Sequence, residues 1–233
     1  MIPAPVVEQI DGILVVRDDF IPGGTKRSFA DQLIAGRREV VYASPVYGGA
    51  QIAISHAARE LGTQATIFCA KRNHPHPRTL EAHSAGAKIV QIPHGYLSNV
   101  KAKARAYCEQ TGARLLPFGL ETQTAFEAIA ARAKAAQAQT GEIDQVWCVG
   151  GSGVLCRGLQ RGIIAKSFHV VQIGRELKAA DVGSAKVYEH PLDFAKDAKI
   201  KPPFPSCSNY DAKAWEYVKL CGKGRVLFWN VMK

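Results

Sequence analysis

The feature that most constrains the fold of this 233-residue chain is a regular alternation of short β-branched runs with longer amphipathic runs. Segments such as 13–16, 40–44 and 145–149 have the length and composition of buried strands. The segments between them carry apolar residues at helical spacing. This pattern is typical of an α/β protein, in which each crossover between parallel strands holds a helix. The length allows one large domain or two small ones.

The individual elements are predicted from apolar spacing and from the positions of glycine and proline. We expect strands at 13–16, 40–44, 66–69, 88–92, 114–117, 145–149, 168–173, 186–189 and 225–230. We expect helices at about 25–36, 50–61, 78–85, 97–110, 122–139, 155–165 and 212–220. Thr25 is expected to cap the first helix and Gly36 to end it. The prolines within 201–205 exclude regular structure there.

Composition narrows the class of protein. Hydrophobic residues make up 47% and charged residues 21%, values that exclude a disordered, collagen-like or coiled-coil chain. No apolar run approaches the roughly 18 residues of a membrane span, and the first residues lack the order of a secretory signal, so we expect a cytoplasmic protein. The six cysteines form no CxxC pair, and His74 and His76 lie in a proline loop without a carboxylate or thiol at ligand spacing. We therefore expect reduced thiols and no metal site.

The net charge of +10 is unevenly spread along the chain. Residues 71–105 hold seven basic residues and one acidic residue, and residues 151–233 hold fourteen and seven. Two interpretations stay open. These segments bind phosphate, an anionic substrate or nucleic acid, or they form a solvated lysine-rich surface.

The first candidate site is the segment Gly23-Gly24-Thr25-Lys26-Arg27, which follows an acidic strand end at 17–19. Paired glycines allow a tight turn, and Lys26 falls in the first turn of the expected helix. There the helix dipole and Arg27 would favour the neutral amine that attacks carbonyl groups. The competing interpretation is an exposed lysine after an ordinary glycine turn.

The second candidate is the glycine-rich turn Val149-Gly150-Gly151-Ser152-Gly153-Val154, between an expected strand and an expected helix. Backbone N–H groups of such a turn, together with a helix N-terminus, form a cradle for phosphate. The turn matches neither the dinucleotide-binding GxGxxG pattern nor the Gly-Lys-Ser/Thr of a nucleoside-triphosphate loop.

Two further segments carry weaker signals. The turn at 44–51 also joins a strand to a helix and offers free N–H groups to an anion such as a carboxylate. Tyr210 and Asp211 could supply a proton-transfer group and a carboxylate partner for a ring nitrogen. The alternative for this pair is a helix-capping Asp beside a half-buried Tyr.

Taken in order, these segments resemble the fold type II (tryptophan synthase β-like) pyridoxal-phosphate enzymes. The resemblance is greatest to the aminocyclopropane-carboxylate deaminase and D-cysteine desulfhydrase branch, in a shortened form. Gly-Gly-Thr-Lys at 23–26 is similar to the family's Gly-Gly-Asn-Lys, which holds the cofactor lysine. The segment 44–62 is similar to the turn and helix that follow, 151–159 to the family's Gly-Ser-Gly-Gly-Thr loop, and 208–213 to its Asp-Pro-x-Tyr-Glu-Gly-Lys motif.

The resemblance implies two three-layer α/β/α subdomains with mostly parallel sheets. The large, cofactor-binding one would comprise residues 1–36 and 120–233, and the small one residues 37–119. It implies a cytoplasmic homodimer that binds pyridoxal 5'-phosphate and acts on a small amino-acid-like substrate as a lyase or deaminase. Lys26 would form the internal aldimine and move the proton at Cα, Asp211 would lie near the ring nitrogen, and Tyr210 over the substrate.

The resemblance also implies which other residues contact the ligands. The implied cofactor-binding residues are Lys26, Gly150, Gly151, Ser152, Gly153, Val154, Leu155 and Asp211. The implied substrate-binding residues are Ser44, Tyr47, Gly48, Gly49, Ala50 and Gln51.

The chain departs from the family pattern in three places. Gly49 stands where the family has an asparagine, Val154-Leu155 replaces Gly-Thr in the phosphate loop, and the stretch before Tyr210 is shorter. Two alternative functions therefore stay open. One is a pyridoxal-phosphate enzyme acting on an amino-acid-modified base within DNA, which the basic segments favour. The other is a binding protein that kept the fold without catalysis.

Overall fold

The computed structural model describes residues 2–93 and 95–233, and its chain divides into two compact units. Unit 1 comprises Met1–Thr25 and Gln123–Lys233, and unit 2 comprises Lys26–Thr122. The sequence analysis placed the two divisions at 36/37 and 119/120. The segment after Thr25 falls in unit 2 because its helix packs on the helix 50–61 of that unit.

Unit 1 is built on a six-stranded sheet with the order β1-β2-β10-β7-β8-β9. The strands are β1 (Val7–Ile10), β2 (Ile13–Arg17), β7 (Ile143–Gly150), β8 (Ala165–Gln172), β9 (Lys186–Glu189) and β10 (Val226–Asn230). Only β1 runs antiparallel to its neighbour, and the other pairs are parallel. Because β10 comes last in the sequence yet pairs between β2 and β7, both ends of the chain contribute to the centre of this sheet.

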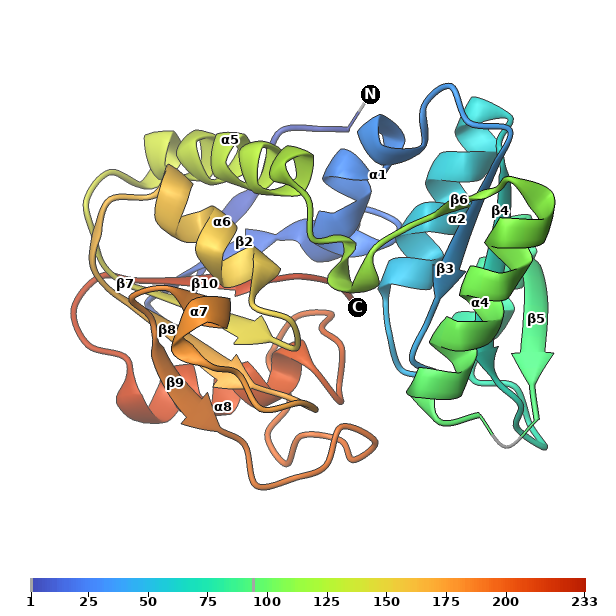
Figure 1. Ribbon diagram of the computed structural model, residues 1–233. Helices are drawn as coiled ribbons and strands as arrows, with labels where there is room; N and C mark the ends of the chain where they lie inside the picture. Colours follow the sequence, from blue (N-terminus) through green and yellow to red (C-terminus); the bar gives the residue numbers. More distant parts are fainter. Residues whose placement is uncertain (1, 94) are drawn as a thin grey trace. The chain divides into compact units, whose positions relative to one another are not determined.

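Helices cover both faces of this sheet, which makes three layers (Figure 1). The helices of unit 1 are α5 (Gln123–Thr140), α6 (Val154–Gly162), α7 (Ala179–Val182) and α8 (Asp211–Cys221). α5 and α6 pack on each other over one face, and α8 lies on the opposite face (Figure 1). A short 3-10 helix, Asp18–Phe20, follows β2. The central strands supply a core of large side chains, among them Trp147, Phe228 and Trp229.

Unit 2 is a smaller layered unit with a fully parallel sheet of order β5-β4-β3-β6. Its strands are β3 (Glu39–Ala43), β4 (Gln64–Ala70), β5 (Lys88–Ile92) and β6 (Arg114–Leu115). Its helices are α1 (Arg27–Ile34), α2 (Ala50–Leu61), α3 (Pro77–Ser84) and α4 (Leu97–Thr111). α4 lies on one face of the sheet and α2 on the other (Figure 1). The 3-10 segments Gly24–Lys26 and Phe118–Leu120 lie at or near the junctions between the units.

The expected α/β fold with mostly parallel sheets is confirmed, but three local expectations differ from the structure. β1 and α7 were not expected from the sequence. Thr25 does not cap α1, because its hydroxyl donates to Asp18, and the helix begins after Lys26 without a side-chain cap. No helix among the described residues is both long enough and apolar enough to cross a membrane.

The contact between α5 and α6 depends on glycine. A Cβ atom added at Gly158 would lie 2.5 Å from the Ile129 side chain, and one added at Gly162 would lie 2.3 Å from the carbonyl oxygen of Ala130. The second contact is the more restrictive, since a backbone carbonyl cannot rotate away as a flexible side chain can.

We predict that Gly162→Ala lowers the free energy of unfolding by about 1–3 kcal/mol, because the added methyl group separates α5 from α6. Chemical denaturation monitored by circular dichroism measures this change. The control is Ala131→Ser, which adds one atom on the exposed side of α5 and should change stability by less than about 0.5 kcal/mol. Equal stability of Gly162→Ala and the wild type would contradict the close packing.

Candidate functional site

The carboxyl ends of the parallel strands bring the sequence-predicted residues of unit 1 to one edge of its sheet. β2 leads into Asp18 and the Gly23-Gly24-Thr25 turn, β10 leads into Val231, and β7 leads into the glycine turn at 150–153. Since β10 lies between β2 and β7, the two glycine turns flank it at a span of about two strand spacings, roughly 10 Å. Ligands of open parallel sheets bind at this kind of edge.

A buried carboxylate fixes the turn that precedes Lys26. Asp18 is fully buried, and its Oδ2 accepts hydrogen bonds from the Thr25 hydroxyl at 2.7 Å and the Trp229 indole N–H at 3.0 Å. Its Oδ1 accepts from Arg132 of α5 at 2.8 Å. The Trp229 N–H also lies 3.0 Å from the Thr25 hydroxyl oxygen. Four segments distant in sequence therefore meet at one carboxylate.

The neighbouring carboxylate, Asp19, holds the ends of β2 and β10 together. Arg17 donates to both oxygens of Asp19 at 2.8 Å, and Asn230 donates to Oδ1 at 2.7 Å. The hydrogen bond to Asp19 raises the pKa of the Arg17 guanidinium, which keeps the guanidinium charged. Glu8 of β1 also contacts Arg17.

The second glycine of the turn is required by space as well as by conformation. Gly24 has φ +66°, and an added Cβ would lie 2.1 Å from the Val231 carbonyl oxygen. That same oxygen accepts the Thr25 N–H at 3.1 Å. The backbone leading to Lys26 is thus held against the end of β10, and the Lys26 side chain itself is half-buried.

The local charge around Lys26 differs from the sequence expectation. Arg27 is buried, and its guanidinium binds Asp31 at 2.5 Å and Glu60 at 2.6 Å. Because two carboxylates compensate its charge, Arg27 is a weaker reason for a neutral amine at Lys26 than the sequence suggested. The role of Lys26 stays a prediction.

The glycine turn between β7 and α6 has the geometry of an anion cradle. Gly153 has φ +81°, and a Cβ there would lie 1.8 Å from the Asp181 carbonyl oxygen. Gly153 is also the N-cap residue of α6 and provides no side-chain cap, so the first amides of this nine-residue helix have no side-chain acceptor at the cap. Arg175, which the sequence analysis did not single out, donates to the carbonyl of Ser152 at 3.4 Å and to Asp181 at 2.7 Å. A cation therefore stands beside the turn.

Tyr210 and Asp211 lie at the start of α8, next to these turns. An added Cβ at Gly151 would lie 3.2 Å from the Tyr210 hydroxyl oxygen. Burial and the nearby Asp211 charge raise the pKa of Tyr210, although the Gly151 amide opposes the rise, so this hydroxyl stays protonated near neutral pH. Asp211 is fully buried, and its Oδ1 accepts the Val231 N–H at 2.9 Å. Both residues thus lie on the edge that carries the Thr25 turn.

Lys213 of α8 is a buried amine in unit 1. Its Nζ donates to the carbonyl oxygens of Leu192 and Asp193 at 3.2 and 2.7 Å. Burial lowers its pKa. Because two backbone carbonyls already accept from this group, Lys213 serves to hold the loop at 190–194.

In unit 2, the turn at 44–51 joins β3 to α2 and stabilises itself. The Gly48 amide donates to Pro45, and the buried Gln51 amide nitrogen donates to the carbonyls of Val46 and Gly48 at 3.2 and 3.0 Å. Gln51 nitrogen is therefore used within the turn, and its contact with a substrate stays a prediction. Gly49, the N-cap residue of α2, provides no side-chain cap, so the helix start presents uncapped amides.

Basic side chains surround Tyr47 in this turn. The Arg72 guanidinium lies 5.3 Å from the Tyr47 ring centroid, and Arg78 donates to the Tyr47 carbonyl. His76 packs edge-on against the same ring at 4.9 Å, and its Nδ1 accepts the Arg78 N–H at the start of α3. The basic segment at 71–105 thus places cations beside the predicted carboxylate turn. The described residues contain no group of three or more His, Cys, Asp or Glu placed to hold a metal.

Comparisons with known proteins support the fold. No protein-family model and no curated protein sequence matches this chain. Among solved structures, an ACC deaminase homologue is similar at TM-score 0.77 and 16% identity, covering 94% of this chain and 84% of its own. Diaminopropionate ammonia lyase from Escherichia coli has TM-score 0.70 and 14% identity, covering 94% and 77%. O-ureido-L-serine synthase has TM-score 0.72 and 12% identity, covering 95% and 84%. The expected tryptophan synthase β-like fold is confirmed.

We predict that Asp18→Asn lowers the free energy of unfolding by about 3–5 kcal/mol, because it leaves the Arg132 charge buried without its carboxylate. The matched control is Asp11→Asn, which changes an exposed pair with Lys219 and should have a far smaller effect. Denaturant unfolding of both variants measures the difference. Equal losses in the two variants would contradict the anchoring role of Asp18.

Proposed function

We propose that this protein is a pyridoxal-phosphate-dependent enzyme of the lyase or deaminase class, acting at Cα of an amino-acid substrate. The observation that carries the proposal is the position of two turns on one sheet edge. The Gly23-Gly24-Thr25 turn, followed directly by Lys26, and the glycine turn at 150–153 flank β10. A lysine directly after one turn and an anion cradle at the other suit a ligand that carries both an aldehyde and a phosphate.

The residues present fit the phosphate group. Glycines 151 and 153 let the turn pack closely, because an added Cβ would lie 3.2 Å from the Tyr210 hydroxyl oxygen and 1.8 Å from the Asp181 carbonyl oxygen. The start of α6 has no side-chain cap. The amides of Ser152 to Leu155 would bind phosphate oxygens, and the Arg175–Asp181 ion pair lies beside them. Val154 and Leu155 provide no hydroxyl, so backbone amides would make these contacts.

The turn at 44–51 would bind the substrate carboxylate through the uncapped amides of Gly49 and Ala50 at the start of α2. Arg72 and Arg78 beside Tyr47 increase the positive potential of this turn. The carboxylate would thereby fix the orientation of the amino acid.

Three side chains would handle the protons and the ring. Pyridoxal phosphate, when bound, withdraws electrons from Cα of an attached amino acid. Lys26 Nζ would hold the aldehyde carbon until the substrate amine replaces it, and the released Lys26 amine would then take the Cα proton. Tyr210, kept protonated by its raised pKa, would donate a hydrogen bond and not act as a base. Asp211 would face the ring nitrogen from the start of α8.

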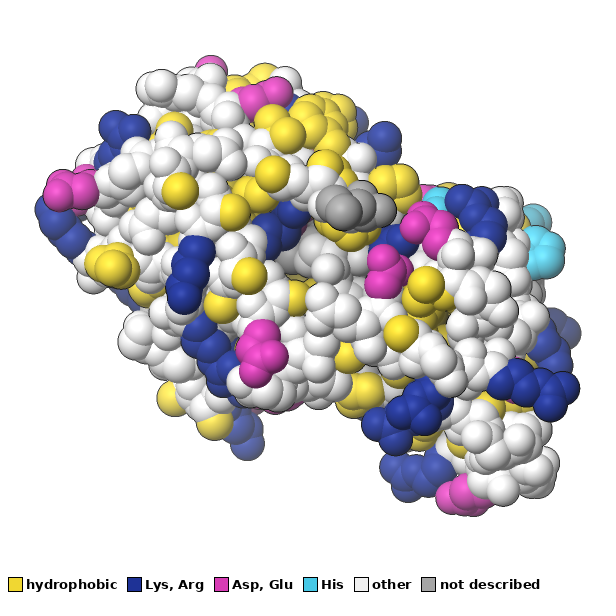
Figure 2. Space-filling view, turned by 90° about the horizontal axis from the view of Figure 1, so that it is seen from above, with side chains coloured by type: hydrophobic (Ala, Val, Ile, Leu, Met, Phe, Trp, Pro, Cys, Tyr) yellow, Lys and Arg dark blue, Asp and Glu magenta, His cyan; other side chains and the backbone are white. Residues whose placement is uncertain are grey.

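The solved structures support this reaction class without fixing the substrate. Their names include an ammonia lyase, a deaminase homologue and a synthase, which act on different amino acids. A cytoplasmic location and a homodimer stay predictions. On the face drawn in Figure 2, basic side chains lie in several separate groups.

We predict that incubation with pyridoxal phosphate produces a saturable visible absorption band in the wild type, and that Lys26→Ala abolishes it. Lys26→Ala removes the amine that would bind the cofactor covalently. The control Lys103→Ala removes an exposed lysine of α4 and should retain the band. Circular dichroism of each variant verifies folding.

Two outcomes of this measurement would contradict the proposal. A band of equal intensity in folded Lys26→Ala would assign the cofactor to another amine. The absence of any band in the folded wild type would favour the non-catalytic binding protein.

A further inference from the structure

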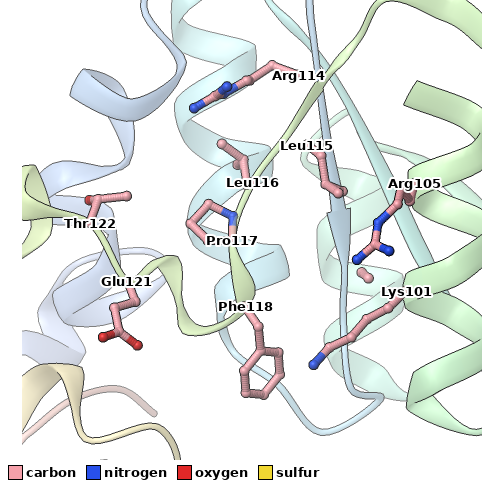
Figure 3. Close-up of a pocket in the computed structure, with 10 residues that line it drawn as sticks. Lys101, Arg105, Arg114, Leu115, Leu116, Pro117, Phe118, Glu121 and Thr122 are labelled. Atoms are coloured by element: carbon pink, nitrogen blue, oxygen red, sulfur yellow. The ribbon is translucent and has the colours of Figure 1, made fainter. Parts of the chain in front are cut away.

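Unit 2 contains a pocket of about 550 Å³ at the carboxyl edge of its sheet (Figure 3). The lining comes from the end of β3, from α4, from β6 and from the segment that follows β6. The lining residues are Ala43, Lys101, Arg105, Arg114, Leu115, Leu116, Pro117, Phe118, Glu121 and Thr122. The volume lies within the range of small-molecule sites, about 300–1,000 Å³.

The sheet topology accounts for a pocket at this place. The chain adds β4 and β5 on one side of β3, then returns through α4 and adds β6 on the other side. The strand order therefore reverses between β3 and β6, and the carboxyl ends of these two parallel strands lie side by side. Such a reversal leaves a crevice beyond the strand ends, where open α/β sheets bind ligands.

The pocket combines positive charge with an apolar wall. Lys101 and Arg105 extend from neighbouring turns of α4 to the same side of the pocket, and Phe118 lies next to Lys101 (Figure 3). The Lys101 ammonium is 4.2 Å from the Phe118 ring centroid. Leu115 and Pro117 continue the apolar wall. The pocket therefore suits an anion with a flat apolar body, because the cations complement its charge and the apolar wall complements its body.

The two cations lack a carboxylate partner in the part of the chain that the structure describes. No described ion pair includes Lys101 or Arg105, and the hydrogen bonds of α4 do not engage either head group. Like charges four residues apart on a helix destabilise it slightly. A bound dianion would remove this repulsion, and an Arg beside a Lys suits a phosphate group.

We propose that this pocket is a binding site for a small organic phosphate with a flat apolar body, separate from the glycine turn of unit 1. The phosphate contacts Lys101 and Arg105 at the rim, and the apolar body lies against Leu115, Pro117 and Phe118. This inference does not depend on pyridoxal-phosphate catalysis, because all of its residues belong to unit 2.

The test uses naphthyl phosphate as a fluorescent probe in equilibrium dialysis with the full chain. We expect saturable binding by the wild type, and at least about tenfold weaker binding by the double variant Lys101→Gln/Arg105→Gln, since two charge-assisted contacts are lost. The matched control is Lys103→Gln, which removes a charge from the same helix outside the pocket and should bind like the wild type.

Comparison probes separate the two parts of the site. Naphthol, which lacks the charge, and inorganic phosphate, which lacks the apolar body, should both bind more weakly than naphthyl phosphate. Arg175→Gln, which removes a side chain beside the glycine turn of unit 1, should leave naphthyl phosphate binding unchanged if the sites are separate.

The proposal is overturned if the folded wild type shows no saturable binding, or if the double variant binds as tightly as the wild type. Equal affinities for inorganic phosphate and naphthyl phosphate would contradict the proposed contact between the apolar body and the apolar wall. Weaker probe binding by folded Arg175→Gln would place the probe at the glycine turn. None of these results affects the absorption test of Lys26, so the two proposals can fail separately.

Discussion

The buried carboxylate of Asp18 is the interaction on which the candidate site depends. A buried charge costs several kcal/mol unless it is paired and hydrogen-bonded, and Asp18 accepts from Arg132, Thr25 and Trp229. These partners belong to α5, to the glycine turn and to the last strand. The need to satisfy one carboxylate therefore holds both ends of the chain together and fixes the backbone one residue before Lys26.

One physical principle builds both of the anion-binding turns in the proposed function, the turn at 150–153 in unit 1 and the turn at 44–51 in unit 2. In both units, parallel strands bring their carboxyl ends to one edge, and the next helix begins there with uncapped amides. Helix starts of this kind attract anions without any charged side chain. Unit 1 offers such a start beside the Lys26 turn, and unit 2 offers one beside Arg72 and Arg78. A substrate with a carboxylate and a cofactor with a phosphate would each have a place.

Much of the fold could be predicted from sequence, because the spacing of apolar residues and the positions of glycine and proline are local signals. The expected strands at 40–44, 88–92 and 186–189 correspond closely to β3, β5 and β9. The prediction that Thr25 caps the first helix was wrong, because its hydroxyl donates to Asp18. This contact depends on the tertiary structure and cannot be read from the local sequence. β1 was not expected because it is a short edge strand, paired on one side only and not fully buried.

The candidate site was predictable only in part, for a related reason. Glycine turns and a following lysine are visible in the sequence, so Lys26 and the segment 150–155 could be named. Arg132, Arg175 and Trp229 could not, because nothing near them in sequence indicates that they meet Asp18 or Ser152. The sequence also did not indicate that the Gln51 side-chain nitrogen donates to carbonyl groups of its own turn. A glutamine at the start of a helix could equally bind a ligand.

The most direct test of the central claim is identification of the amine that binds the cofactor. The protein would be incubated with pyridoxal phosphate, reduced with borohydride, digested and mapped by mass spectrometry. Our account predicts one modified residue, Lys26, which follows the turn fixed by Asp18 and Val231. Modification of the buried Lys213, or a distribution over exposed lysines with Lys26 unmodified, would contradict it.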